Sequence, residues 1–349
     1  MSHKSRKVSL HKQAYDVLTR KLEGGRGTSK KKAKEEGTVH LFIFSYSTYN
    51  EYRRVANQFC KYVTENYPNE KKLKGARKHV PEWLDYKSNS VNNRGELLSP
   101  HTIQTYAKAL GKLYDIDPTS EDYYVPPTRH REDTKKGRVP VANNRHFNPD
   151  KHPDFVHLCV SIGLRRHELE LLMREHLMSK ETLVFHKKRI EATPNAMRTA
   201  EDRKLYTAIL DALDFFPDTR YFVYVYKGKG GRARLSPIFG EYEDEVIQRI
   251  KATPNGQKVC VQVFSAANIH GYRAQYAVAI YNAKARPIDE IPYDTDLTGL
   301  KQKKQGDVYV CRGSLKGIRL DRKALVCASK ALGHNRESVI PTNYIYSVA

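Results

Sequence analysis

The sequence predicts a mostly α-helical α+β protein with one small antiparallel sheet, and three observations predict it. Apolar residues recur at helical spacing in two stretches of the first third of the chain. Farther along, residues 221–226 are β-branched or aromatic and are followed by glycines, which is typical of a strand that enters a hairpin turn. The length of 349 residues favours two domains with extensions over a single domain.

The first 38 residues are predicted to be a basic arm. They hold eleven Lys and Arg against four Asp and Glu, a net charge of +7, and several glycines. The sequence leaves open whether this arm is a disordered, solvated tail or a region that contacts accessory sites on a binding partner.

Residues 39–127 are predicted to form a small helical domain. A capping box is expected at Thr48, and the apolar residues that follow it have helical spacing. A second helix is expected to begin at Pro100 with Ser99 as its N-cap, because proline is favoured at the first helical position.

Residues 128–150 are predicted to be a linker, because residues 118–150 hold five prolines and a run of charged residues lies at 129–138. Residues 151–349 would form the second domain, with mixed helices and a short antiparallel sheet. We expect that sheet to include residues 221–226 and 233–238.

The charge of the chain favours a nucleic-acid partner. There are 61 Lys and Arg against 39 Asp and Glu, a formal net charge of +22, and the isoelectric point is near 9.6. No apolar run approaches the roughly 20 residues that cross a bilayer, and no signal-peptide pattern follows the N-terminus. We therefore expect no membrane partner and a cytoplasmic, nucleoid-associated location. On charge alone, a basic RNA-binding protein remains an alternative.

Five short motifs carry the chemistry. In chain order they are Gly163-Leu-Arg165-Arg-His-Glu168-Leu, Gly228-Lys229-Gly-Gly-Arg-Ala-Arg234, His270-Gly-Tyr-Arg273, Leu332-Gly-His334 and Tyr344. A phosphodiester is anionic and gains charge on its oxygens in the transition state, so fixed cations stabilise that state. Arg165 and Arg273 are candidates for such a clamp, because a guanidinium meets two phosphate oxygens at once.

The remaining motifs can supply a nucleophile and proton carriers. Lys229 could protonate a departing 5′-oxygen, because the pKa of an ammonium shifts readily on desolvation. The phenol of Tyr344 becomes a nucleophile when a base or nearby cations help to remove its proton, and His270 and His334 are the candidates.

These motifs, in this order, resemble those of the tyrosine recombinase family, which includes phage and transposon integrases. The resemblance covers about residues 40–349. It implies that Arg165, Arg273 and His334 bind the scissile phosphate and that His270 shares in proton handling. It also implies Lys229 as general acid, Tyr344 as nucleophile and Glu168 as a support behind the phosphate-binding residues.

Two positions have an alternative in the sequence. Arg166 adjoins Arg165 and could be the clamp residue, although the spacing of the family motif selects Arg165. Tyr346 follows Tyr344 by two residues and is the alternative nucleophile. Tyr344 is ten residues after His334, which is nearer to the family spacing.

The sequence also departs from compact members of the family. Arg273 and His334 stand 61 residues apart, which indicates an inserted loop and hairpin at about residues 284–320. Basic residues in this insertion could reach DNA or could form a solvated surface.

The resemblance implies a helical core-binding domain followed by a catalytic domain, which together would form a C-shaped clamp on double-stranded DNA. The implied activity is site-specific recombination for a mobile genetic element, through a 3′-phosphotyrosyl intermediate and a four-way junction. A homo-tetramer on paired DNA sites is implied too, and an accessory DNA-bending or directionality factor is left open. The alternatives are a type IB topoisomerase-like enzyme and a non-catalytic DNA-binding relative.

No cofactor or metal is expected. The hairpin glycines lack the strand-to-helix context and the Lys-Ser/Thr ending of a nucleotide-binding loop. His167 and Glu168 begin a His-Glu-x-x-His pattern, but leucine replaces its second histidine. The five cysteines are isolated and are expected to be reduced packing residues.

Overall fold

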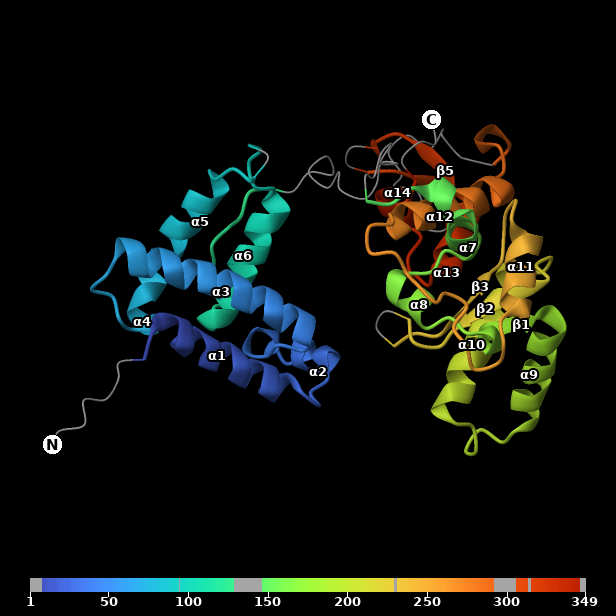
Figure 1. Ribbon diagram of the computed structural model, residues 1–349, viewed down its shortest axis with the longest axis horizontal. Helices are drawn as coiled ribbons and strands as arrows, with labels where there is room; N and C mark the ends of the chain where they lie inside the picture. The colour runs from blue at the N-terminus through green and yellow to red at the C-terminus, as the bar shows by residue number, and fades with distance from the viewer. Residues whose placement is uncertain are drawn as a thin grey trace. The chain divides into compact units, whose positions relative to one another are not determined.

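A computed structural model of the chain describes residues 8–93, 95–128, 146–228, 231–291, 306–312 and 315–345. The chain divides into two compact units, Met1–Thr134 and Lys135–Ala349. The described residues are mostly helical and carry small antiparallel sheets (Figure 1), so the predicted α+β class is confirmed.

The first unit is a group of α-helices joined by short 3-10 helices, which are labelled η. Its elements are α1 (Leu10–Gly25), α2 (Lys30–Glu35), η1 (Val39–Leu41), α3 (Tyr46–Asn66), α4 (Leu73–Ala76), η2 (Arg77–His79), α5 (Val80–Ser88) and α6 (Pro100–Leu113). α1 and α6 both pack against α3. The indole of Trp83, on α5, lies 5.6 Å from the ring of Phe59 and 5.5 Å from that of Tyr106. These rings fill the centre of the unit.

The predicted basic arm, residues 1–38, needs correction, because α1 lies within it and belongs to the core. Leu10, Ala14, Leu18 and Leu22 recur at four-residue spacing, so they share one face of the helix, and all four are buried. The net charge of residues 1–38 does not reveal this buried apolar face, because it counts the charged residues and ignores the spacing of the apolar ones.

The two helix starts predicted for this unit have different outcomes. α6 begins at Pro100 with Ser99 as its N-cap, as predicted. α3 begins before the expected Thr48, because Ser45 is its N-cap. The hydroxyl of Ser45 accepts a hydrogen bond from the amide of Thr48 at 3.2 Å.

The second unit combines helices with short strands. Its helices are η4 (Pro149–Lys151), α7 (Pro153–Ile162), α8 (Arg166–Glu170), η5 (Arg174–His176), α9 (Lys180–Ala192), α10 (Ala200–Phe215), α11 (Glu243–Ala252), α12 (Ile269–Lys284), η6 (Ile288–Glu290), α13 (Arg322–Ala331) and α14 (Val339–Asn343). Its strands are β1 (Leu177–Ser179), β2 (Tyr221–Val225), β3 (Arg234–Pro237), β4 (Val308–Val310) and β5 (Arg319–Asp321).

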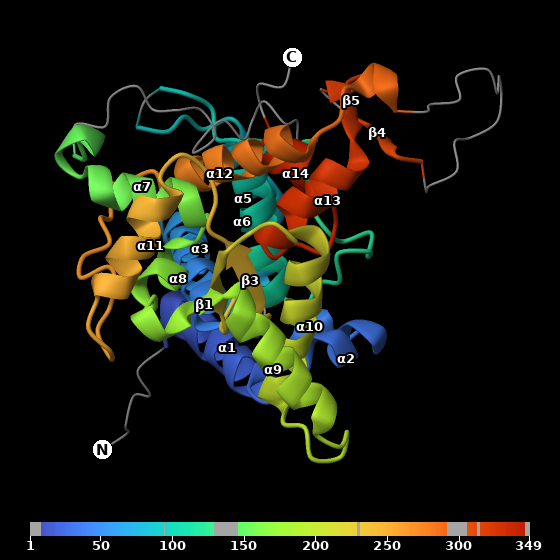
Figure 2. The ribbon, with the colours of Figure 1, turned by 90° about the vertical axis from the view of Figure 1, so that its right-hand side faces the viewer.

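The larger sheet has the order β1-β2-β3, and both of its pairings are antiparallel. Successive residues of a strand point to opposite faces of a sheet. Accordingly, Phe222 belongs to a core that includes residues of α10, α12 and α13, whereas Val223 belongs to one that includes residues of α7 and α11. Helices therefore cover both faces, as the view in Figure 2 also shows.

Strands β4 and β5 pair antiparallel within the predicted insertion at 284–320, of which residues 292–305 and 313–314 lie outside the described residues. Most of the predicted linker also lies outside them, namely residues 129–145. All five cysteines are free thiols. Among the described helices, none has the length and apolar character that a membrane span requires.

Candidate active site

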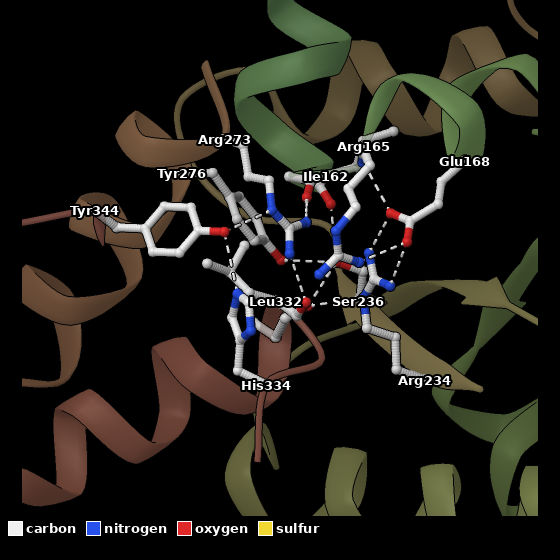
Figure 3. A network of polar contacts seen from close by, with 12 residues as sticks. Ile162, Arg165, Glu168, Arg234, Ser236, Arg273, Tyr276, Leu332, His334 and Tyr344 are labelled. Atoms are coloured by element: carbon white, nitrogen blue, oxygen red, sulfur yellow. Dashed lines mark hydrogen bonds and ion pairs between the residues drawn. The ribbon is translucent and has the colours of Figure 1, made fainter. Parts of the chain in front are cut away.

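Tyr344 directly follows α14 and is only 4% exposed. Its hydroxyl lies 3.0 Å from Nε2 of His334 and accepts a hydrogen bond from Nε of Arg273 at 3.4 Å (Figure 3). The guanidinium of Arg273 also lies 5.8 Å from the centre of the tyrosine ring. The fold therefore brings Tyr344 into contact with two other predicted site residues, Arg273 and His334.

His334 is positioned by the end of α13. Gly333 adopts a left-handed conformation with φ of 70°, and its amide donates to the carbonyl of Lys330 at 2.9 Å. The amide of His334 donates to the carbonyl of Ser329 at 2.8 Å. These two bonds form a Schellman motif, in which glycine supplies the positive φ that ends a helix. The Leu-Gly-His sequence thus fixes the backbone position from which the imidazole of His334 extends.

Arg273 lies in the second turn of α12 and is 1% exposed. Its Nη1 donates to the carbonyl of Gly163, and its Nη2 donates to the carbonyl of Leu332 at 2.5 Å. Burial, and then the charge of Arg234, lower the pKa of Arg273 to about 10. The guanidinium therefore remains a cation at neutral pH, held in one orientation by backbone oxygens.

Arg165 is the N-cap residue of α8 and is bound to Glu168 twice. Its amide donates to Oε2 of Glu168 at 2.8 Å, and its Nη1 donates to Oε1 at 2.7 Å. The side chain of Arg165 is 26% exposed, whereas that of Glu168 is 3% exposed. The buried carboxylate of Glu168 thus orients the side chain of Arg165, while part of that arginine stays accessible to a ligand.

Glu168 is held in its ionised form. Burial acts to raise the pKa of this carboxyl group, but the hydrogen bonds and charge of Arg234, together with Arg165, outweigh burial and hold the pKa well below its ordinary range. Arg234 makes a bidentate pair with Glu168, with distances of 3.0 Å and 2.7 Å.

Arg234 ends one of the five motifs but was not predicted from the sequence to be a site residue, and the glycines of that motif were interpreted as a hairpin turn. The available signal is the period of the strand, because Arg234 and Ser236 of β3 are polar and share one face of a sheet that helices cover. The hydroxyl of Ser236 donates to the carbonyl of Ile162 at 2.8 Å, so it too is bonded inside the core.

His270 lies in the first turn of α12, and Asn268 is the N-cap of that helix. The His270 ring centre is 5.5 Å from that of Tyr344, with the ring planes tilted by 48°. His270 is exposed, whereas Tyr344 is buried.

Lys229 and Tyr346 both lie outside the described residues. The residues that flank Lys229 form a turn, in which the amide of Gly228 donates to the carbonyl of Arg232 at 2.9 Å. Gly228 and Arg232 line a pocket that His334 also lines. The described residues on either side of position 229 therefore lie beside His334, which is predicted to bind the phosphate.

Arg166, the alternative to Arg165, has a different set of partners. Its guanidinium donates to the carbonyls of Phe264 at 2.8 Å and Ser265 at 3.0 Å, with longer bonds to Val263 and Ala267. Arg166 thus holds the loop that precedes α12, whereas Arg165 joins the Glu168 network.

Comparisons with protein-family models, curated proteins and solved structures found no match to this chain. A buried tyrosine hydroxyl, a histidine at hydrogen-bond distance and two oriented guanidinium groups are suited to attack on an anionic, tetrahedral centre. Within the described ranges, no group of three or more His, Cys, Asp or Glu side chains could hold a metal ion.

Proposed function

We propose that this chain is a tyrosine recombinase that cuts and rejoins duplex DNA, with Tyr344 as its nucleophile. The observation that carries the proposal is the position of the Tyr344 hydroxyl, 3.0 Å from Nε2 of His334 and within hydrogen-bond distance of the Arg273 guanidinium. A nucleophile next to a proton acceptor and a cation is the arrangement that activates a phenol.

The proposed step exchanges one phosphodiester for another. The oxygen of Tyr344 attacks the phosphorus, its proton passes to His334 or His270, and the bond from phosphorus to the 5′-oxygen breaks. Lys229 would give a proton to that departing oxygen. Reversal of the step by the 5′-hydroxyl of another strand rejoins the DNA, so neither a nucleotide nor a water molecule is consumed.

Arg165 and Arg273 would stabilise the charge that builds on the non-bridging phosphate oxygens. Arg165 has the more accessible side chain of the two, and its charge acts on Arg273. Because Arg273 is only 1% exposed, the phosphate would meet Arg165 first and would reach Arg273 as Tyr344 shifts toward the phosphorus.

The net charge of +22 supports duplex DNA as the partner. Counterion release would make DNA affinity fall steeply as salt rises. The proposal includes the two-domain integrase architecture, assembly as a homo-tetramer on paired sites, and exchange through a four-way junction.

The test is covalent trapping. The protein is incubated with a random-sequence pool of nicked duplexes, in which the cleaved fragment diffuses away and cannot religate. We expect a denaturation-resistant protein–DNA adduct with the natural sequence and none with Tyr344→Phe. Failure to trap any adduct from the pool would refute the proposal, and relaxation of supercoiled plasmid without strand exchange would favour a topoisomerase instead.

A further inference from the structure

Arg234 differs from the arginines of the predicted clamp because its guanidinium is buried within the protein. Its side chain is 7% exposed and faces Glu168, whose side chain is 3% exposed. Nη1 and Nη2 meet the two carboxylate oxygens, and Nε donates to the carbonyl of Ala331 at 3.2 Å. The substrate would therefore touch Arg165, and Arg234 stands behind it.

Arg234 also supports the turn that carries His334. The carbonyl of Ala331, which accepts from Arg234, belongs to the last residue of α13. A Cβ placed on Gly333 would lie 2.6 Å from Cδ of Arg234, so the arginine stem packs directly against the backbone of that glycine. Gly333 immediately precedes His334. One side chain from β3 thus contacts both the α8 motif and the α13 turn.

From these contacts we propose that Arg234 is a positioning residue, which fixes Arg165 through Glu168 and fixes His334 through the Ala331–Gly333 turn. The inference rests on the proposed function, because the two held groups are its phosphate ligands. Lysine cannot replace Arg234, since an ammonium is a point charge and lacks the planar fork that meets a carboxylate at two points while Nε binds a carbonyl.

The first test measures the single-turnover rate of adduct formation by Arg234→Lys on the nicked duplex that traps best. A displacement of about 1 Å at a catalytic group can slow a reaction on the order of 10²-fold, and we expect a loss of that size. The matched control is Arg286→Lys, which alters another bidentate arginine pair with a buried carboxylate, Asp321. Arg286 lies just beyond the C-terminal end of α12, and that end is about 16 Å along the helix from Arg273.

The control separates positioning from general destabilisation. We expect Arg286→Lys to keep the natural adduct rate, and we expect Arg234→Lys to change DNA affinity and the thermal midpoint no more than Arg286→Lys does. An Arg234→Lys protein that is folded and reacts at the natural rate would overturn the inference.

A double variant tests the route through Arg165. If Arg234 acts by holding Arg165, Arg234→Lys should do little further harm once Arg165 is replaced by alanine. The adduct rate of the double variant should then be much higher than the rate obtained by multiplying the two single losses, because the effects of coupled residues are not additive. Losses that simply multiply would overturn that route. If Arg234→Lys does not fold, Glu168→Gln serves in its place, since it keeps the shape of the side chain and removes the charge that both arginines meet.

A measurement without DNA keeps the inference separate from the proposed function. In protein labelled with ¹⁵N-arginine, Arg234→Lys should shift the side-chain signal of Arg165 and speed its exchange with water. An unchanged signal would refute the positioning role even if no duplex is ever cleaved. Absence of any adduct from the natural sequence, with a shifted signal, would refute only the proposed function.

Discussion

The hydroxyl of Tyr344 lies 3.0 Å from Nε2 of His334, and the two rings are 5.5 Å apart with their planes tilted by 50°. This contact joins the residue that follows α14 to the Schellman turn that ends α13. The helix ends hold both partners in place, so the pair is set before any ligand arrives.

Replacing His334 should slow formation of the covalent adduct. We expect His334→Ala to lose roughly 10²-fold in rate, because proton handling by a positioned side chain contributes about that much or more. His334→Gln restores a hydrogen-bonding amide and should recover part of the loss. Single-turnover trapping measures both rates, and an alanine variant as fast as the natural protein would remove His334 from the site.

Alanine substitutions at the adjacent arginines Arg165 and Arg166 should have different effects. Arg165→Ala should reduce the adduct rate by about 10²–10³-fold, which is the loss seen when one donor to a developing oxyanion is removed. Arg166→Ala should mainly lower the free energy of unfolding, because the carbonyls of the 263–267 loop lose their donor. Adduct kinetics and urea unfolding of the same two proteins check the contrast.

A reversed result would identify Arg166 as the clamp residue. In that case Arg166→Ala would be folded and slow, and Arg165→Ala would react at the natural rate.

Ionised Glu168 should make the second unit sensitive to acid. Its pKa is lowered in the folded protein from an ordinary value of 4.5, so below that pH the unfolded chain binds more protons than the folded one. The stabilisation is fully present above about pH 4.5 and is lost as the pH falls toward the folded-state pKa. Urea unfolding at a series of pH values from 7 to 3 measures it.

The Glu168→Gln protein is the comparison for this pH series, because other carboxylates also titrate in the window. It should be less stable at neutral pH and should lose less stability below pH 4.5 than the natural protein. If both proteins lost the same amount of unfolding free energy below pH 4.5, the assigned role of the Glu168 carboxylate would be contradicted.

The helix α1 should contribute to the stability of the first unit. Leu18 is fully buried, so Leu18→Ala should lower the unfolding free energy by about 2–5 kcal/mol, as other buried leucine truncations do. Tyr15, on the same helix, is 40% exposed, and Tyr15→Ala should have a much smaller effect. Equal and negligible effects would indicate that this helix is not part of the core.

Local sequence patterns predicted the elements whose signals are short-range. Ser99 and Pro100 mark the start of α6 because capping depends on neighbouring residues alone. The same rule placed the start of α3 too late, since both Ser45 and Thr48 have hydroxyls that can cap a helix and only the backbone decides which one does.

Long-range relations were harder to predict. Arg234 and Glu168 stand 66 residues apart, and nothing near either residue announces the pair. The buried apolar face of α1 was missed for a related reason. The helix that covers it, α3, belongs to a separate segment, and many of the residues near α1 are charged. The pairing of Tyr344 with His334 could be anticipated, because both residues belong to motifs that follow one another in the order of the resembled family. The 3.0 Å contact itself is known only from the fold.

The central claim is that the oxygen of Tyr344 becomes linked to DNA, and mapping the linked residue tests it most directly. The trapped adduct is digested with protease and nuclease, and the peptide that retains a nucleotide is sequenced by mass spectrometry. We predict a nucleotide on Tyr344 and no adduct from Tyr344→Phe. A nucleotide on Tyr346 or on any other residue, or an adduct that persists in Tyr344→Phe, would contradict the assignment.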